Sequence, residues 1–288
     1  MSGTKFAAMA IARNGDCEVF YQSFGSSSDP ALLLINGLGS QSINYHDAWC
    51  TKFVAKGFYV IRFDNRDVGL STSYEGAQVG PEGNAYTVSD MARDAVAVLD
   101  AEGIERGHVM GLSMGGMIVQ TLAIEHPGRL LSATSVMSTT GEPEFGQSTP
   151  RALALLTAPP ATDRESYVRA SIDGLHEWGS PEFADEARWR RDAEAAFDRS
   201  FRPTGSGRQF LAIRASGQRA EKLKSVRIPM LVMHGDKDTL IDQSGGRRSA
   251  ELVPGAKFVL IEGMGHDYPP QLWDRWVDEV TGFIASLS

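Results

Sequence analysis

A glycine-flanked serine at the end of an apolar run constrains the fold more than any other stretch of this 288-residue chain. The run 108–110 leads into Gly111-Leu112-Ser113-Met114-Gly115-Gly116, and a helix-like segment follows at 117–124. A strand that turns sharply into a helix needs small residues on both sides of the turn, because the two backbones approach closely there. The sequence therefore predicts a strand, a tight turn with Ser113 at its strained apex, and a helix. The same short pattern also occurs by chance at junctions without any chemistry.

Strand and helix patterns alternate along most of the chain. Helical spacing occurs at 44–56 and 90–99, and Asn14-Gly15 between the strand-like pieces 6–12 and 18–24 predicts an antiparallel hairpin at a sheet edge. Apolar runs typical of buried strands lie at 31–35, 59–63, 130–137, 230–234 and 258–261. This alternation predicts an α/β fold with a mostly parallel, doubly wound sheet.

The alternation breaks between residues 138 and 218, where prolines and charged segments replace apolar strands. Helical spacing is present at 150–156 and 187–197. Because the strand pattern resumes afterwards, we expect a helical cap insertion at 138–218 on a core formed by 1–137 and 219–288. Aromatic side chains in the insertion could line an apolar pocket or simply hold its helices to the core. They are Tyr167, Trp178, Phe183, Trp189, Phe197 and Phe201.

Composition narrows the class of protein. The formal net charge of −8 argues against nucleic acid or an anionic membrane as a partner, because both attract clustered lysine and arginine. Two cysteines, Cys17 and Cys50, are too few for a disulfide framework and do not have the spacing of metal ligands. The N-terminal residues lack the apolar core of a secretion signal, so we expect a cytoplasmic protein. The sequence leaves the oligomeric state open, a homodimer included.

A serine hydroxyl becomes a nucleophile only with a base and an orienting carboxylate, and in this type of turn both follow it in the order acid, then histidine. Asp236 and Asp238 come directly after the strand 230–234. We favour Asp238, because the acid must reach towards the histidine loop, whereas Asp236 is placed to cap the turn. Of six histidines, only His266 combines a glycine-rich loop after the last strand with the required chain order.

Backbone N–H groups are expected to bind the oxyanion of the reaction. One belongs to the residue after the nucleophile, Met114, and the other to the loop after the strand 31–35, where Leu38 is our choice. A phosphate-binding role for this glycine-rich loop is disfavoured, since it lacks the Lys-Ser/Thr of a P-loop and the three glycines of a dinucleotide site. The sequence therefore predicts neither a cofactor nor a metal ion.

Three motifs together resemble the α/β-hydrolase superfamily: Gly111 to Gly116, His234-Gly235-Asp236-Lys237-Asp238 and Gly263-Met264-Gly265-His266. The loop Phe63 to Ser71 is similar to the one after the fourth strand in that family, and Asn36-Gly37 stands where the family usually has His-Gly.

Over nearly its whole length, including the stretch 136–141, the chain is most similar to bacterial carboxylesterases of the aclacinomycin methylesterase type. This resemblance implies an α/β-hydrolase fold with a helical cap. It also implies a catalytic triad of Ser113, Asp238 and His266, with Leu38 and Met114 as oxyanion residues.

The identity of the nucleophile narrows the predicted reaction. Dehalogenases and epoxide hydrolases of this fold carry aspartate at the turn, so serine disfavours both. We expect hydrolysis of a small-molecule carboxylic ester through an acyl-enzyme. A lactonase or a cofactor-free perhydrolase would use the same triad, a carbon–carbon bond hydrolase is not demanded by any feature, and a non-catalytic ligand-binding member of the fold is a further alternative.

Overall fold

The computed structural model describes residues 10–77 and 85–287, and in this part of the chain eight strands form one sheet in the order β1-β2-β4-β3-β5-β6-β7-β8. The strands are β1 (Ala10–Asn14), β2 (Cys17–Phe24), β3 (Ala31–Ile35), β4 (Tyr59–Phe63), β5 (Gly107–Leu112), β6 (Leu130–Val136), β7 (Met230–Gly235) and β8 (Lys257–Ile261). β1 and β2 form the predicted antiparallel hairpin at one edge, and β2 also pairs antiparallel with β4, whereas β4, β3, β5, β6, β7 and β8 are parallel to one another. Residues 6–9 of the predicted first strand lie outside the described range.

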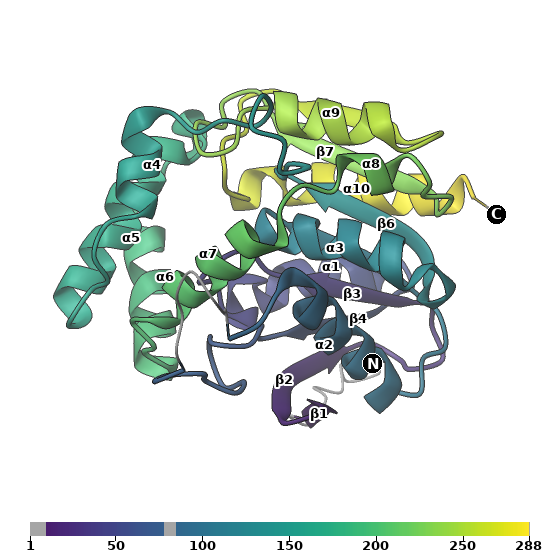
Figure 1. Ribbon diagram of the computed structural model, residues 1–288, viewed down its shortest axis with the longest axis horizontal. Coiled ribbons are helices and arrows are strands. Elements are labelled where there is room, and N and C mark those ends of the chain that lie inside the picture. Colours follow the sequence, from purple (N-terminus) through teal and green to yellow (C-terminus); the bar gives the residue numbers. More distant parts are fainter. Residues whose placement is uncertain (1–9, 78–84, 288) are drawn as a thin grey trace.

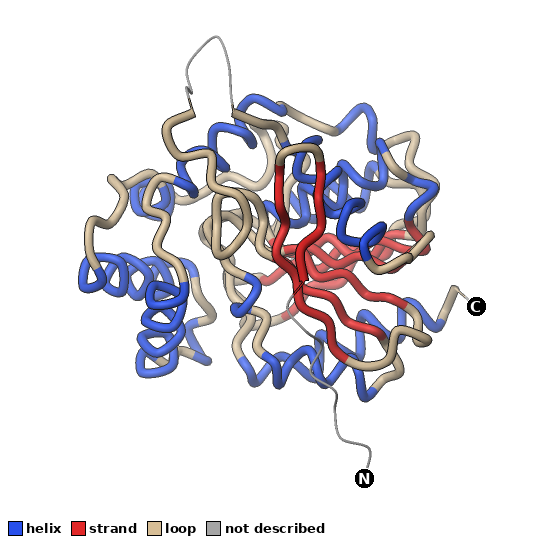
Figure 2. The backbone as a smooth tube through the Cα atoms, turned by 90° about the horizontal axis from the view of Figure 1, so that it is seen from below, coloured by secondary structure: helices blue, strands red, loops and turns tan. Residues whose placement is uncertain are grey.

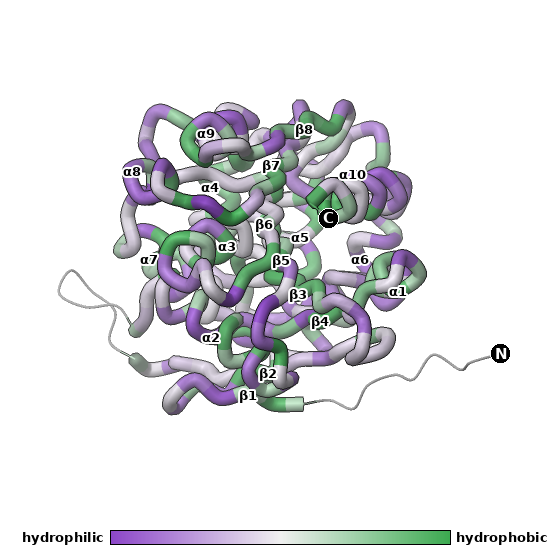
Figure 3. The backbone as a smooth tube through the Cα atoms, turned by 90° about the vertical axis from the view of Figure 1, so that its right-hand side faces the viewer, coloured by the Kyte–Doolittle hydropathy of each residue, from purple (hydrophilic) through white to green (hydrophobic). Residues whose placement is uncertain are grey.

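Helices cover both faces of the sheet, as Figure 3 shows. The helices packed beside the strands are α1 (Asp47–Ala55), α2 (Val88–Ala101), α3 (Met114–Glu125), α8 (Ala220–Leu223), α9 (Ser244–Leu252) and α10 (Trp273–Ala285). Leu32 and Leu34 of β3 pack with α1 and α10, while Leu33 and Ile35 pack with α2 and α3. This alternation follows from the two-residue period of a strand, and it explains why the central strands are continuous apolar runs.

The chain between β6 and β7 forms helices that stand apart from those flanking the sheet (Figures 1 and 2). They are α4 (Pro150–Leu156), α5 (Arg164–Trp178) and α6 (Glu186–Arg199), whereas α7 (Gly205–Ser216) returns to the core, where its Ala212 is buried beside α2. Val168 and Ile172 of α5 bury against Trp189 and Ala193 of α6 in a small core of their own. The helices predicted at 150–156 and 187–197 are confirmed. Within the described residues, no helix is both long and apolar enough to span a membrane.

Candidate active site

Ser113 lies at the turn between β5 and α3 in a left-handed conformation, with φ 57° and ψ −116°. Its N–H donates to the carbonyl of Val136 at the end of β6 at 2.9 Å. A Cβ at Gly111 would lie 2.1 Å from the carbonyl oxygen of Gly115, and a Cβ at Gly115 would lie 2.1 Å from that of Ile35. The predicted strand–turn–helix with a strained serine is therefore confirmed, and so is the need for glycine beside it.

Replacing Gly115 with alanine is expected to lower the free energy of unfolding by about 3 kcal/mol. The new methyl group would collide with backbone atoms of Ile35 and Asn36, so α3 would have to move. Urea unfolding followed by circular dichroism measures the change. The control is Gly282→Ala in α10, where no atom lies within 4 Å of the added Cβ and the effect should be neutral or stabilising by up to about 1 kcal/mol. Equal midpoints for the two variants would contradict the prediction.

Asp238 and His266 follow β7 and β8, and the structure brings them into contact. His266 Nδ1 lies 2.7 Å from Asp238 Oδ2, and the Asp238 side chain is completely buried. The other carboxylate oxygen accepts hydrogen bonds from the N–H groups of Leu240 and Ile241 at 2.9 and 2.8 Å. Burial raises the pKa of Asp238, but the charge of His266 and hydrogen bonds from His234 and His266 outweigh it and lower the pKa to about 2. An ionised carboxylate fixes the proton on Nδ1 of a neutral His266, which leaves Nε2 free to accept one.

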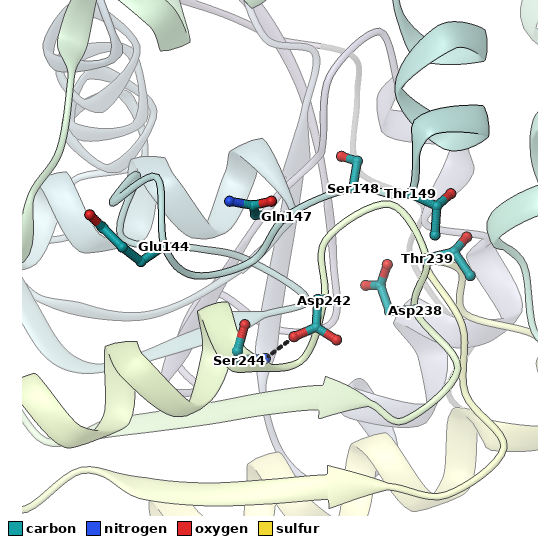
Figure 4. A pocket seen from close by; sticks show the side chains of 8 residues that line it. All are labelled: Glu144, Gln147, Ser148, Thr149, Asp238, Thr239, Asp242 and Ser244. Atoms are coloured by element: carbon teal, nitrogen blue, oxygen red, sulfur yellow. Dashed lines mark hydrogen bonds between the residues drawn. The ribbon is translucent and has the colours of Figure 1, made fainter.

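Asp236, the alternative acid, points elsewhere. Its Oδ1 accepts from the N–H of Gly263 at 2.7 Å, and its Oδ2 pairs with Lys237 at 3.0 Å. Asp236 therefore ties the end of β7 to the start of the His266 loop. Among the described residues, Asp238 contacts His266 and Asp236 does not. Asp238 also borders a hollow of about 520 Å³ that is lined by polar residues, Thr239 and Asp242 among them (Figure 4).

Ser113 and His266 line one cavity of about 650 Å³. In the described part of the chain no hydrogen bond joins the Ser113 hydroxyl to the His266 ring, although such bonds often form only when substrate is present. Four of the six aromatic residues singled out in the insertion also line the cavity, namely Tyr167, Trp178, Trp189 and Phe201, and Phe210 joins them. Phe197 instead packs behind Tyr167 and Phe201, with ring centroids 5.7 and 4.5 Å away. Some of the predicted aromatic residues thus line the pocket, whereas Phe197 packs among the helices of the insertion.

Leu38 and Met114 lie beside Ser113 in the same cavity. A Cβ at Gly37 would lie 3.3 Å from the Ser113 Cβ, so the loop after β3 packs directly over the turn. The neighbouring Gly39 N–H is occupied by Gln209 Oε1 at 2.8 Å. Within the described residues, the N–H groups of Leu38 and Met114 have no hydrogen-bond acceptor, and the second is one of the free donors at the start of a helix. They are available to an oxyanion at Ser113.

The end of α5 is bonded to the loop that carries His266. The Ser180 N–H and hydroxyl both donate to Asp267 Oδ1, and the Gly265 N–H donates to the Ser180 hydroxyl at 2.9 Å. The His266 N–H donates to the carbonyl of Trp178 at 2.5 Å. The position of His266 thus depends on the insertion, a dependence that sequence reasoning missed. Nothing in the residues around Ser180 signals a partner so far along the chain.

Replacing Ser180 with alanine is expected to lower the free energy of unfolding by about 2 kcal/mol, because the buried Gly265 N–H and Asp267 carboxylate each lose a partner. Ester turnover should also fall, because the loop that carries His266 loses hydrogen bonds that hold it in place. Thermal and urea unfolding, together with turnover of an ester, provide the measurements. In the control Ser171→Ala the lost hydroxyl donates only to the Tyr167 carbonyl within α5, so little change is expected. Equal stability of the two variants would exclude the proposed link.

Comparison with known proteins agrees with the fold described above. The sequence pattern of the α/β hydrolase fold matches residues 30–268. The rhodomycin D methylesterase DnrP of Streptomyces peucetius is 29% identical over 282 residues, which cover 89% of this chain and 91% of the relative. The esterase RhEst1 from Rhodococcus sp. ECU1013 superposes with a TM-score of 0.77 at 25% identity, covering 97% of this chain and 99% of its own.

The enol-lactonase from Burkholderia xenovorans LB400 shares the fold, with a TM-score of 0.77 at 23% identity and coverage of 96% and 100% of the two chains. These matches confirm both the predicted fold class and the resemblance to methylesterase-type carboxylesterases. The chain belongs to the α/β-hydrolase fold family.

Proposed function

We propose that this protein is a serine hydrolase that cleaves a small-molecule carboxylic ester through an acyl-enzyme. Ser113 is the nucleophile, His266 the general base and Asp238 the acid that orients it. The observation that carries the proposal is the 2.7 Å contact between His266 and a fully buried Asp238, on the same cavity as the strained Ser113. Relatives named as a methylesterase and an esterase support the ester as the bond that is cleaved.

The geometry suggests the following steps. The Ser113 Oγ attacks the ester carbonyl carbon while its proton passes to His266 Nε2. The carbonyl oxygen becomes an oxyanion, which the N–H groups of Leu38 and Met114 stabilise. The carbon–oxygen bond to the alcohol then breaks, and His266 returns the proton to the departing alcohol. Water, deprotonated by the same histidine, attacks the acyl-enzyme and releases the acid, and Ser113 recovers its proton.

The substrate pocket is proposed to lie between a core of residues 1–137 and 219–288 and a cap of residues 138–218. Side chains of α4 to α7 form much of the cavity wall. They include the aromatic rings of Tyr167, Trp178 and Trp189. Such a wall favours an apolar acyl or alcohol group, because burying it removes apolar surface from water. Lactonase, perhydrolase and non-catalytic ligand-binding roles use the same residues and are outcomes of the following test.

The test is a panel of p-nitrophenyl esters of increasing acyl length and aliphatic lactones, assayed with the wild type. We expect ester turnover that an active-site phosphonate abolishes, with a single adduct located on Ser113 by mass spectrometry. Faster turnover of lactones would make the protein a lactonase. Peracid formation from hydrogen peroxide and a carboxylic acid would indicate a perhydrolase. Binding without turnover of any substrate, or an adduct elsewhere, would exclude the proposed reaction.

A further inference from the structure

A second histidine contacts the carboxylate of Asp238. His234 is the penultimate residue of β7, and its side chain is completely buried. Its Nε2 lies 2.8 Å from the carbonyl oxygen of Ile241 and 3.3 Å from Asp238 Oδ2, the same oxygen that contacts His266 Nδ1. Asp238 Oδ2 therefore lies between two imidazole rings, and the catalytic steps above use only one of them.

The hydrogen bonds of His234 determine its proton. A carbonyl oxygen can only accept, so Nε2 must carry the hydrogen. Nδ1 has no hydrogen-bond partner among the described residues, and it packs against α9, where a Cβ at Gly246 would lie 2.4 Å away. Nε2–H is therefore the N–H of this ring that has acceptors in the described structure. The Nε2–H of His234 is thus directed at Ile241 and Asp238.

This arrangement completes the hydrogen bonding of the acid. Asp238 Oδ1 accepts from two backbone N–H groups, and Oδ2 accepts from His266 and, at the longer distance, from His234. The backbone donors alone leave the carboxylate free to tilt about the axis that they define. A donor behind Oδ2, itself fixed by the Ile241 carbonyl, limits that motion.

We propose that His234 is a positioning residue of the catalytic group: its Nε2–H holds Asp238 Oδ2 in line with His266 Nδ1 and draws negative charge away from it. The inference rests on the proposed function of Ser113, Asp238 and His266. The competing explanation is that His234 merely fills space at the end of β7. The two explanations differ in what removal of the N–H does to the protonation of His266.

The experiment compares His234→Met, which removes the donor at similar side-chain length, with His234→Gln, whose amide can place an N–H near the position of Nε2. The activity readouts are kcat and KM for a p-nitrophenyl ester between pH 5 and pH 9. Supporting partners of an active-site histidine commonly contribute about 10-fold or more to activity. We therefore expect the methionine variant to lose about 10-fold in kcat with little change in KM, and the glutamine variant to recover most of this loss.

The titration of His266, followed by NMR, provides a readout that a space-filling role would not move and that needs no turnover. With the donor lost, Asp238 presents more negative charge to His266, so imidazolium is favoured and the titration midpoint should rise by about half a pH unit. The glutamine variant should titrate like the wild type. In the described part of the chain, Asp267 interacts electrostatically with His266 and with Arg188 of α6, and Tyr268 and Asp192 line the same cavity. These groups are unchanged in every variant, so the difference between variants isolates the effect of His234.

His108→Met is the matched control, because this buried histidine of β5 hydrogen-bonds Ser132 at 2.8 Å and does not contact Asp238 in the described structure. It should cost stability without shifting the His266 midpoint. An unchanged midpoint in His234→Met, or an equal shift in the glutamine and methionine variants, would overturn the inference. Failure of the proposed function is distinguishable, because the wild type would then lack Ser113-dependent turnover whatever the NMR titration shows.

Discussion

Replacing Ser113 with alanine is expected to reduce kcat for ester hydrolysis by about 10⁶-fold, as loss of the nucleophile does in other serine hydrolases. Alanine keeps the backbone of the turn but removes the only atom that forms the acyl-enzyme. Substrate should still bind, since the cavity wall and the N–H groups of Leu38 and Met114 are retained. The measurements are initial rates for the best ester of the panel and a binding titration with a slow substrate or product.

Ser171→Ala is the control for this variant, because Ser171 lines the same cavity but its hydroxyl is engaged within α5. We expect its kcat to stay within about twofold of the wild type, because the substitution removes no group that takes part in the reaction. A Ser113→Ala protein that retains a tenth of the activity would show that another group attacks the ester. That result would remove the basis of the proposed mechanism.

The second large effect is expected at Asp238. Asp238→Asn should lower kcat by about 10⁴-fold, because an amide can donate to Nδ1 of His266 and so favours the tautomer that cannot accept the serine proton at Nε2. Asp236→Asn should change kcat by less than about threefold. Its amide oxygen can still accept from the Gly263 N–H, and only the exposed pair with Lys237 is lost.

Both variants are measured as kcat across pH, with unfolding as a check on structure. Since the pKa of Asp238 is about 2, the wild-type acid should stay ionised through the whole accessible range. The stability that its ionised form contributes is present above about pH 4, the ordinary value of an aspartate, and is lost as the pH falls towards 2. A larger loss in the Asp236 variant than in the Asp238 variant would reassign the acid.

The sequence by itself determined the sheet and the elements that carry the candidate site. Apolar runs predict the buried strands, because parallel strands are covered on both faces, and the glycines around Ser113 predict the sharp turn. Once these strands are parallel, the segments that follow β5, β7 and β8 must meet at one edge. The sequence could therefore single out Ser113, His266 and the two candidate acids Asp236 and Asp238, of which it favours Asp238.

Only the tertiary structure decided which side chains meet within those loops. Asp236 and Asp238 are equivalent by spacing, and the direction of each depends on hydrogen bonds to backbone groups of Gly263, Leu240 and Ile241. Ser180 reaches Asp267 across 87 residues, and His266 reaches Asp238 across 28. Local patterns encode the period of a strand or helix, whereas these contacts depend on how separate segments pack together. That packing has no period in the sequence.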